Sequence, residues 1–489
     1  MAENRLAVVI LAAGQGKRMQ SSTPKVLHRV LGEPMLHHVL RAAAALKPAK
    51  TVVVTGHGRA QVEAFVAGYA KAHPSEAPTC IEQVNPNGTG HAVLCAQPAW
   101  DDCAEVLVLY GDVPLLQVET LRGLVAGRQG GLMSLLVADQ PDPTGYGRVL
   151  LQEDDRIARV VEQKDANDKE RAVTIVNAGM MTVQADFLRT SLGRLRPDNA
   201  QGELYLTDLL AMAAEVARPA RAYFAPEPSE IQGVNNRAEC ALATQLLRRR
   251  LNRAHMLAGV ALEDPETTWI EASVQLDADC TIAGQCELRG NTWVARGARI
   301  DRGCVVHDCE VGPGAHLLPY TVATESRIGP EAHVGPFAHL RSGTVLEDKV
   351  KVGNFVETKK AHLKKGAKAS HLSYLGDAEI GAGCNIGAGT ITCNYDGVNK
   401  FRTVLGENVF IGSDSQLVAP VNLGDGVFVG AGTTVTGDVP AGALALSRTK
   451  QVNIEGWVAK KKARDAQLAA DKQRAGAHAA GAASGGAAI

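Results

Sequence analysis

The chain has 489 residues, which is too long for one ordinary hydrophobic core and predicts more than one domain. Its 51 Lys and Arg residues balance 52 Asp and Glu residues, so the charge predicts neither a nucleic-acid nor a membrane partner, and an anionic ligand must be held by local cations. No apolar run approaches the roughly 18 residues of a membrane-spanning helix. The first residues show no signal-peptide cleavage pattern, so we expect a cytoplasmic protein.

Residues 1–236 alternate short aliphatic strands with helical stretches. Strands are expected at 6–14, 51–56, 105–112, 131–138 and 174–183, and an amphipathic helix at 30–46. This alternation predicts an α/β domain with a mostly parallel, Rossmann-like sheet. Ligands of such sheets bind outside the carboxyl ends of the strands, so the loops at 14, 56 and 112 should line one cleft.

The loop after the first expected strand is rich in glycine and followed by basic residues. It reads Leu11-Ala12-Ala13-Gly14-Gln15-Gly16-Lys17-Arg18-Met19, with Pro24-Lys25 downstream. Met19 stands where a dinucleotide-binding loop has its third glycine, and the Gly-Lys-Ser/Thr of a P-loop is absent. What remains is a glycine loop whose backbone N–H groups can approach an anion beside Arg18 and Lys25.

Another polar stretch, Tyr110-Gly111-Asp112, ends a strand in a carboxylate. An Asp at this position can simply cap the following turn. The alternative is a metal site, because Mg²⁺ on a triphosphate takes one or two protein oxygens and completes its shell with phosphates and water.

The segment 237–259 has apolar residues at helical spacing and an Arg-rich outer face, which predicts a linker helix. Arg248 to Arg250 could instead bind an anion, but a solvated helix face accounts for them. The tail at 458–489 is rich in Ala and Gly and has few bulky apolar residues, so we expect it to be disordered.

Between 260 and 457, aliphatic residues recur at intervals of six. The clearest series is Leu405, Ile411, Leu417, Leu423, Val429 and Val435, and the same interval appears from Ile270 to Val306. The register slips by one at Val311, falters from about 358 to 379, and is interrupted by the polar segment 394–402. Period six fits neither a helix nor an isolated strand, so it predicts a parallel β-helix with three short strands in each coil. Cys280, Cys286, Cys304 and Cys384 fall at repeat positions and should be small buried side chains.

The weakly repeating zone concentrates polar residues that a coil does not need for packing. They are Arg341, Glu357, Lys359, His371, Tyr374, Asn385, Asn394 and Tyr395. Breaks in a solenoid form loops at one edge, where binding residues collect, so this zone is the second candidate site.

Several runs resemble known families. The run LAAGxGxRM at 11–19 with Pro24-Lys25 is similar to the signature of sugar-nucleotide pyrophosphorylases, and the hexads resemble the left-handed β-helix of hexapeptide acyltransferases. The runs at 354–360, 371–377, 385–397, 411–420 and 447–448 resemble the acetyltransferase half of the bacterial bifunctional UDP-N-acetylglucosamine pyrophosphorylase/glucosamine-1-phosphate N-acetyltransferases. The resemblance to that bifunctional family covers about residues 5–457.

For the first half, the resemblance implies transfer of UMP from UTP to N-acetylglucosamine-1-phosphate. The implied site residues are Leu11, Ala12, Ala13, Gly14, Arg18, Lys25, Gln83, Gly88, Thr89, Tyr110, Gly111, Asp112, Gly147, Glu162, Asn177 and Asn235. Asp112 and Asn235 would hold Mg²⁺, while Arg18 and Lys25 would neutralise the phosphates. Gln83 and the segment 88–92 would bind the base, and the loops at 145–148, 162–165 and 177–179 would contact the sugar.

For the second half, the resemblance implies acetylation of glucosamine-1-phosphate by acetyl-CoA, ahead of the first reaction, in a pathway that supplies peptidoglycan and lipopolysaccharide precursors. The implied site residues are Arg341, Glu357, Lys359, His371, Tyr374, Asn385, Ala388, Asn394, Tyr395, Ser413, Ala431 and Arg448. His371 is the expected base, oriented by Glu357, and Asn385 would place the amine. Arg341, Lys359 and Tyr374 would bind the sugar phosphate, and Ala388, Asn394, Tyr395, Ser413, Ala431 and Arg448 would bind acetyl-CoA. A homotrimer, with its acetyl site built from neighbouring chains, is also implied.

Two departures and two alternatives accompany this interpretation. Lys17 stands where the family usually has Thr, and Pro86-Asn87 replace a common Gln-Leu pair beside the nucleotide. One alternative is a nucleotidyltransferase whose β-helix serves only oligomerisation or regulation, which His371, Asn385 and Arg448 in their motifs argue against. The other is a structural solenoid with a degenerate first domain, which should have lost Lys25 or Asp112.

Overall fold

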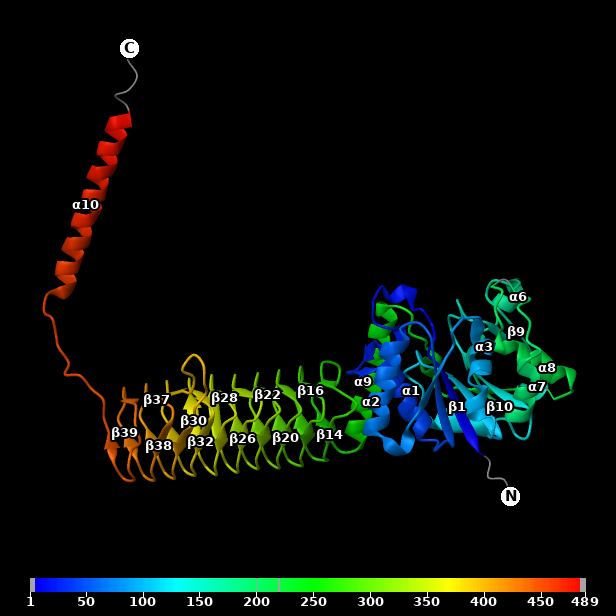
Figure 1. Cartoon of the computed structure of the whole chain (residues 1–489), viewed down its shortest axis with the longest axis horizontal. Helices are drawn as coiled ribbons and strands as arrows, with labels where there is room; N and C mark the ends of the chain where they lie inside the picture. The colour runs from blue at the N-terminus through cyan, green and yellow to red at the C-terminus, as the bar shows by residue number, and fades with distance from the viewer. Residues whose placement is uncertain (1–4, 200, 219, 484–489) are drawn as a thin grey trace, which may run out of the picture.

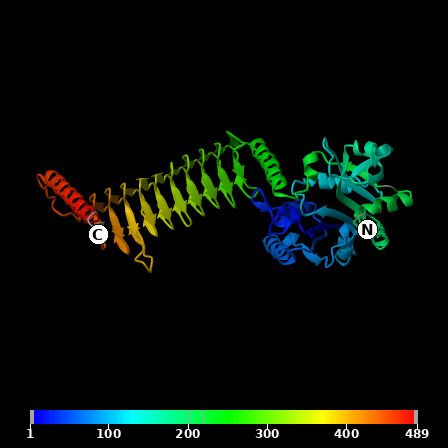
Figure 2. The ribbon, with the colours of Figure 1, turned by 90° about the horizontal axis from the view of Figure 1, so that it is seen from above.

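The computed structural model describes residues 5–199, 201–218 and 220–483. An α/β domain leads through the long helix α9 (Arg237–Leu257) into a rod of short strands, and the final helix α10 (Trp457–Ala483) points away from the rod (Figure 1). Seen from above, α9 lies between the α/β domain and the first coils of the rod (Figure 2). Among the described helices, none has both the length and the apolar character needed to cross a membrane.

The sheet of the α/β domain is mixed. In spatial order its main strands are β11 (Arg221–Phe224), β7 (Met133–Asp139), β10 (Ile175–Gln184), β6 (Glu105–Tyr110), β1 (Leu6–Leu11), β4 (Lys50–Thr55) and β5 (Thr79–Glu82). Strand β10 is antiparallel to β6 and β7, whereas β6, β1, β4 and β5 run parallel to one another. The antiparallel pair β8 (Arg148–Leu151) and β9 (Ile157–Val161) adjoins β10. The carboxyl ends of β1, β4 and β6 share one edge, as the prediction of a single cleft requires.

Alternate residues of each strand face opposite sides of this sheet, and helices cover both sides. Val9 and Val108 pack on one side, against α3 (Gly88–Cys95), α7 (Ala185–Leu192) and α8 (Leu209–Glu215). Val8 and Leu107 pack on the other side, against α1 (Met35–Ala44), α2 (Arg59–Ala72) and α5 (Val118–Ala126).

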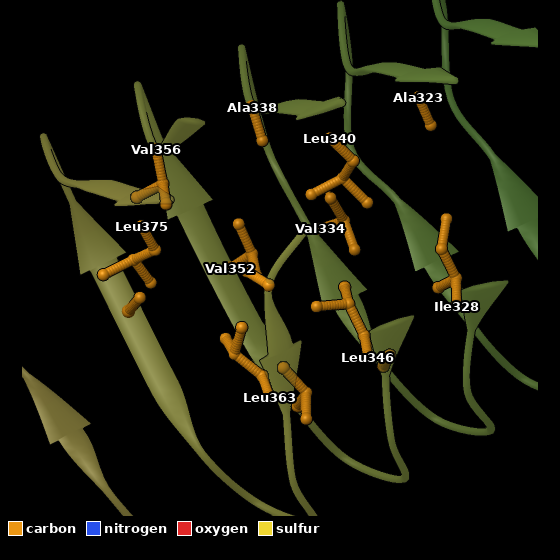
Figure 3. Packing of buried hydrophobic residues seen from close by; sticks show 14 of the residues in the cluster. Ala323, Ile328, Val334, Ala338, Leu340, Leu346, Val352, Val356, Leu363 and Leu375 are labelled. Atoms are coloured by element: carbon orange, nitrogen blue, oxygen red, sulfur yellow. The ribbon is translucent and has the colours of Figure 1, made fainter. Parts of the chain in front are cut away.

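The rod is a parallel β-helix built from three sheets. The first sheet runs from β12 (Ala261–Leu262) to β41 (Leu444–Ala445), the second from β13 (Trp269–Ile270) to β40 (Thr434–Val435), and the third from β14 (Gln275–Leu276) to β38 (Val421–Leu423). Aliphatic side chains from all three sheets fill the interior (Figure 3). The four cysteines predicted to be buried lie in this core.

The slips in the hexad pattern follow from coils of two lengths. Leu317 stacks on Val334, and Val334 stacks on Val352 in the next coil along the chain. The coil from Val334 to Val352 keeps the interval of six on all three sides. The coil from Leu317 to Val334 is shorter, because one of its sides has lost a residue. The register change at Val311 is such a shortened side.

The prediction that the repeat falters from 358 to 379 is wrong, because the coil continues through this segment. Thr358 and Ala369 occupy the inward positions there, stacked on Leu340 and Val352, and both are fully buried. Thr358 is tolerated because its hydroxyl forms a 2.9 Å hydrogen bond with that of Thr344. A search for Val, Ile and Leu alone misses these two positions.

Helix α9 is found where the linker helix was expected, and it contacts both neighbours. Ala243 and Leu247 pack in one cluster with Met35 and Leu115 of the α/β domain. Near the other end, the Asn252 amide donates to the carbonyls of Pro265 and Thr268 at the start of the β-helix.

The three consecutive arginines of α9 are engaged within the protein. Arg248 and Arg249 face Glu266, and Arg250 donates to the carbonyl oxygen of Leu115. The helix-face interpretation is therefore preferable to an anion site.

The disorder expected for the tail at 458–489 is not found in residues 458–483, which belong to the helix α10, and residues 484–489 lie outside the described residues. Ala, Lys, Arg and Gln all have high helix propensity, which the prediction from low hydrophobicity did not weigh. The side chains described there, through residue 476, are almost all exposed, so propensity rather than packing accounts for this helix.

Candidate active sites

A cavity of about 270 Å³ opens at the carboxyl edge of the α/β sheet. The predicted residues that line it are Leu11, Ala12, Ala13, Gly14, Lys25, Gln83, Gly88, Thr89, Tyr110 and Asp112. Glu203 also lines it and was not predicted, because an isolated Glu in a loop carries no pattern. The glycine loop at 11–19 and the strand end at 110–112 therefore share one cleft, as predicted.

Glycine is required at two places in this wall. Gly16 has φ +59°, and a Cβ there would lie 2.7 Å from the Cβ of Lys25. Gly88 has φ +88°, and a Cβ would lie 2.6 Å from the carbonyl oxygen of Leu204. These positions combine a left-handed backbone with close approach, so a side chain at either one would displace the wall.

Lys25 lies between two oxygen donors that come from distant parts of the chain. Its ammonium forms an ion pair with the Asp112 carboxylate and donates a 2.7 Å hydrogen bond to Oδ1 of Asn235. Asp112 follows β6, and Asn235 immediately precedes the N-cap of α9. One carboxylate and one amide oxygen that converge on a single cation form a donor set that suits Mg²⁺ shared with phosphates. The two predicted metal ligands are therefore brought together.

The predicted base-binding segment is fixed by internal hydrogen bonds. Gln83 is buried, and its side-chain amide nitrogen donates to the carbonyl oxygen of Gly88 at 3.1 Å and lies 3.1 Å from Nδ1 of His91. The Thr89 hydroxyl accepts from the backbone N–H of Leu206. These contacts hold the first turn of α3 against the cavity.

The predicted sugar-contacting residues Gly147, Glu162 and Asn177 lie next to one another, and Glu162 is close enough to Tyr110 to act on its pKa. Asn177 donates its backbone N–H to the carbonyl of Gly147, and Glu162 lies so close that a Cβ on Gly147 would be 3.3 Å from its Oε1. Burial, with Asp112 and Glu162 nearby, raises the pKa of Tyr110. Burial, with Asp165 nearby, also raises the pKa of Glu162. These carboxylates and the phenol therefore belong to one electrostatic environment.

Six predicted residues do not line the cavity, namely Arg18, Gly111, Gly147, Glu162, Asn177 and Asn235. Gly111 donates its N–H to the carbonyl of Leu11 at 2.9 Å, which ties the ends of β1 and β6 together. Arg18 is exposed in the short helix η1 (Lys17–Met19), on the same glycine loop. Its position allows the guanidinium to approach a ligand from the solvent side.

The second candidate site follows the corner of the β-helix where the first sheet turns into the second, here called the first corner. Tyr320, Phe337, Phe355 and Leu372 occupy equivalent exposed positions on successive coils, and the three aromatic rings are stacked at centroid distances of 5.2 and 5.6 Å. The next residues in this series are small or polar, namely Gly389, Asp414 and Gly432, each linked to the preceding coil through the backbone.

Because the side chains change from bulky to small, the first corner carries only small or polar residues from Gly389 to Gly432. We call this stretch the open track. The predicted acetyl-CoA residues Ala388, Ser413 and Ala431 each precede one of these small residues by one position. Arg448 reaches the far end of the track, where its guanidinium donates to the carbonyl oxygen of Ala431 at 3.0 Å and 3.2 Å.

His371 lies at the near end of this track, at the end of β30 (Lys368–His371). Its Nδ1 is 2.9 Å from Oδ1 of Asn354, its neighbour on β27 (Lys351–Asn354). An amide oxygen only accepts, so Nδ1 of the neutral ring carries the proton and Nε2 keeps a lone pair. A base needs this tautomer.

The predicted orientation of His371 by Glu357 is corrected by these contacts, because Glu357 accepts a 2.6 Å hydrogen bond from Arg341 instead. Asn354 was missed, although it opens the run at 354–360 and stands one coil before His371. The stacking of successive coils is the signal that could have identified it.

Cations gather at the opposite edge of the second sheet. Arg341 on β25 (His339–Arg341) pairs in register with Lys359 on β28 (Glu357–Lys359). Contact with the Lys400 ammonium, and the charge of Arg341, lower the pKa of Lys359. Mutual repulsion of this kind favours a bound anion, so the cluster suits a sugar phosphate. Lys400 was not predicted, and its place in the polar insertion 394–402 is the only signal for it in the sequence.

Three further predicted residues are distributed around this second sheet. Tyr374 on β31 (Tyr374–Gly376) lies over Gly376, the register partner of Lys359. Asn385 on β33 (Asn385–Ile386) is half-buried and belongs to the first sheet. Asn394 donates to the carboxylate of Asp377 at 2.5 Å.

Tyr395, next to Asn394, is 59% exposed. Both residues follow β34 (Ile391–Cys393), whereas Ala388 precedes it. Within one chain, Asn394 and Tyr395 therefore lie at the edge of the second sheet opposite to the acetyl-CoA track.

Comparison with known proteins supports the same division of the chain. Residues 8–200 match the MobA-like NTP transferase domain, and residues 402–437 match the six-repeat bacterial transferase hexapeptide family. The hexapeptide match and the three parallel sheets confirm the predicted left-handed β-helix.

Full-length relatives also match. A bifunctional protein GlmU from Pelobacter propionicus is 48% identical over 455 residues, which cover 92% of this chain and 98% of the relative. Bifunctional GlmU proteins from Corynebacterium jeikeium and Geotalea uraniireducens are 46% and 45% identical, over 94% of this chain and 94% and 100% of their own lengths.

Proposed function

The chain belongs to the family of bifunctional GlmU proteins, and we propose that it is a two-site transferase of UDP-N-acetylglucosamine synthesis. The β-helix acetylates glucosamine-1-phosphate with acetyl-CoA, and the α/β domain then joins the product to UMP from UTP and releases pyrophosphate. Both reactions take place in the cytoplasm.

In the α/β domain, a phosphate oxygen of N-acetylglucosamine-1-phosphate attacks the α-phosphorus of UTP, and pyrophosphate leaves. The attacking oxygen already carries negative charge, so no protein base is needed. Lys25 and Arg18 bind and neutralise the phosphates, while Gln83, Gly88 and Thr89 hold the base. Mg²⁺ held by Asp112 and Asn235 would supply further positive charge to the triphosphate.

In the β-helix, the amine of glucosamine-1-phosphate must lose a proton before it can attack a thioester. Nε2 of His371 accepts that proton, the nitrogen bonds to the acetyl carbonyl carbon, and the carbon–sulfur bond breaks. A second proton leaves the nitrogen and passes to the sulfur, so CoA is released as a thiol. Arg341, Lys359 and Lys400 hold the phosphate at the far edge of the second sheet. The amine and the phosphate of one sugar are thereby held at two separate points.

The observation that carries this proposal is the hydrogen bond between His371 and Asn354 at the start of an open track. A β-helix used only for oligomerisation has no use for a histidine whose Nε2 keeps a lone pair, on the same coils as a cluster of cations. The alternative of a non-catalytic β-helix is therefore disfavoured.

A homotrimer is the proposed assembly. Ser413 and Ala431 are exposed on a convex corner, whereas ligand sites are concave and enclose most of the ligand. A second chain must supply the missing wall, and Tyr395, exposed at the opposite edge, can complete a neighbour's site. Closed cyclic symmetry is usual for such assemblies.

The proposal is tested by assaying both reactions on one purified sample, with sedimentation on the same preparation. We expect acetylation of glucosamine-1-phosphate, UTP-dependent release of pyrophosphate, and a trimer. Pyrophosphate release without acetylation would favour the non-catalytic β-helix, and an acetylating monomer would rule out the shared site.

A further inference from the structure

We propose that Glu239, in the first turn of α9, is a positioning residue that orients Asn235 for metal and phosphate binding. This inference rests on the proposed uridylyl transfer. Glu239 does not line the cavity. Within the described part of the chain, its side-chain hydrogen bonds go to the two residues that precede the helix.

The contacts fix both the backbone and the side chain of Asn235. Oε2 of Glu239 accepts from the backbone N–H of Asn235 at 2.7 Å and from its side-chain Nδ2 at 3.2 Å. Oε1 accepts from Nδ2 of Asn236 at 2.5 Å, and Oδ1 of Asn236 in turn accepts from the backbone N–H of Glu239. The carboxylate therefore clamps the turn that carries Asn235 to the start of the helix.

The chemistry of the two partners determines which way the Asn235 amide faces. A carboxylate only accepts and an ammonium only donates, so Nδ2 must face Glu239 and Oδ1 must face Lys25. In this orientation Oδ1 points to the place where Asp112 also converges. On the side of Asn235 that faces Glu239, it is the Glu239 carboxylate that requires the amide nitrogen and not the amide oxygen.

The negative charge also acts on the basicity of the amide oxygen. An amide that donates to a carboxylate is polarised, which increases the electron density on its oxygen. Partners behind a metal ligand orient that ligand and raise its basicity in the same way. Glu239 therefore supports a neutral ligand that would otherwise bind a divalent cation weakly.

The helix that carries Glu239 is fixed at both ends. Its first half packs with Val234 and Leu115 of the α/β domain, and Asn252 anchors its second half to the β-helix. Because α9 is held in place, Glu239 also holds Asn235 in a fixed position at the proposed metal site.

The test is calorimetric titration of Mg²⁺ into the full-length protein in the presence of UTP, for the wild type, Glu239→Ala and Glu239→Gln. We expect Glu239→Ala to weaken Mg²⁺ binding by about 10- to 100-fold, the usual effect of removing a partner of a metal ligand. Glu239→Gln should fall between, because its side-chain oxygen still accepts from Asn235 but carries no charge. Raising Mg²⁺ should restore uridylyl transfer by Glu239→Ala, and acetylation should be unchanged.

Two further variants make the outcome specific. Glu266→Ala removes a carboxylate that binds Arg249 on the same helix, far from Asn235, and should leave Mg²⁺ binding unchanged. Asn235→Ala tests the metal site itself. If Asn235→Ala binds Mg²⁺ as the wild type does, the metal assignment of the proposed function fails.

The positioning role alone is overturned if Asn235→Ala weakens Mg²⁺ binding and Glu239→Ala does not. It is also overturned if Glu239→Ala reduces acetylation as much as uridylyl transfer, since this would indicate general damage to the fold. The cap of α9 should survive in the variant, because the backbone N–H of residue 239 still donates to Asn236.

Discussion

The two candidate sites differ in how their residues come together. In the α/β domain, residues as distant as Leu11 and Asp112 line one cavity, because parallel strands end at a common edge, and Asn235 binds Lys25 in its wall. In the β-helix, the residues are spread along an exposed corner and across the neighbouring sheet, each one coil from the next.

This difference has a consequence for function. A converging sheet edge can build a nearly complete site within one chain. A convex corner can present reactive groups at regular spacing but cannot enclose a ligand, so its site depends on a second molecule. Loss of a single group should therefore affect one region and leave the other active.

Removal of the carboxylate at the α/β edge should separate the two activities completely. Asp112→Ala takes away one of the two oxygens that face Lys25, so uridylyl transfer should fall by about 10³-fold or more, as for loss of a central electrostatic group. Acetylation should stay at the wild-type rate. Both rates are measured on one preparation at limiting Mg²⁺, and full uridylyl transfer there would contradict the metal assignment.

The converse variant acts on the β-helix alone. His371→Ala removes the expected base, so acetylation should slow by about 10²- to 10⁴-fold, the usual contribution of a positioned base. Uridylyl transfer should be unchanged. An unaltered acetylation rate would contradict the role of His371 as the base. An acetylated form of the protein trapped during turnover would contradict direct transfer to the amine.

The sequence predicted the converging site better than the dispersed one. The glycine loop, Asp112 and the Gly88 segment carry dense local patterns, and a parallel sheet dictates that they meet. Asn354 and Lys400 carry no local pattern. Their roles depend on which coil stacks on which, and coil length is not constant along the rod. Thr358 and Ala369 stand at inward positions where other coils have Val, Ile or Leu, so the sequence pattern does not show the stacking there.

The same limit explains the misassigned partner of His371. A carboxylate such as Glu357 is a more usual orienting partner for a histidine than an amide such as Asn354. The hydrogen bond between Glu357 and Arg341 cannot be derived without knowing that the two residues lie on adjacent coils. The linker helix, by contrast, was predictable from spacing alone. Its role in positioning Asn235 was not, since Glu239 reads as an ordinary residue of a helical first turn.

The open track at the first corner can be closed without altering any proposed contact residue. Gly389→Phe continues the series of Phe337 and Phe355, which also adopt positive φ, and a Cβ at Gly389 comes no closer than 3.4 Å to another atom. We expect kcat/KM for acetyl-CoA to fall by about 10²-fold, because the thioester is displaced from His371.

Gly426→Phe is the matched control for that substitution. Gly426 has φ +66°, has no atom near its Cβ position among the described residues, and lies at the corner between the third and first sheets. Its variant should acetylate normally. Equal losses in the two variants would mean that aromatic substitution disturbs the coil and that the track is not a binding surface.

A smaller effect should distinguish the two candidate partners of His371. Asn354→Ala removes one hydrogen bond to the ring, so kcat for acetylation should fall by about 10-fold with little change in KM for the sugar phosphate. Glu357→Gln weakens the pairing with Arg341 and should act mainly on that KM. The reverse pattern would restore Glu357 as the orienting group.

Mild acid should distinguish the two regions through stability, with the smallest effect. Burial lowers the pKa of His37 on α1 from 6.5 to about 4, assisted by Arg41 and His73, and burial also lowers the pKa of His38. Above pH 6.5 neither the folded nor the unfolded domain binds these protons. Between pH 6.5 and 4 the unfolded chain takes them up first, so the stability of the α/β domain falls as pH falls.

We therefore expect uridylyl transfer to be lost at a temperature a few degrees lower at pH 5 than at pH 7.5, and His37→Asn should reduce that shift. The measurement is residual activity after heating at each pH, assayed at a common neutral pH so that catalysis itself does not titrate. Acetylation in the same samples serves as the internal control, because His37 and His38 lie on α1 and do not belong to the β-helix core. A shift that persists unchanged in His37→Asn would assign the acid sensitivity to other groups.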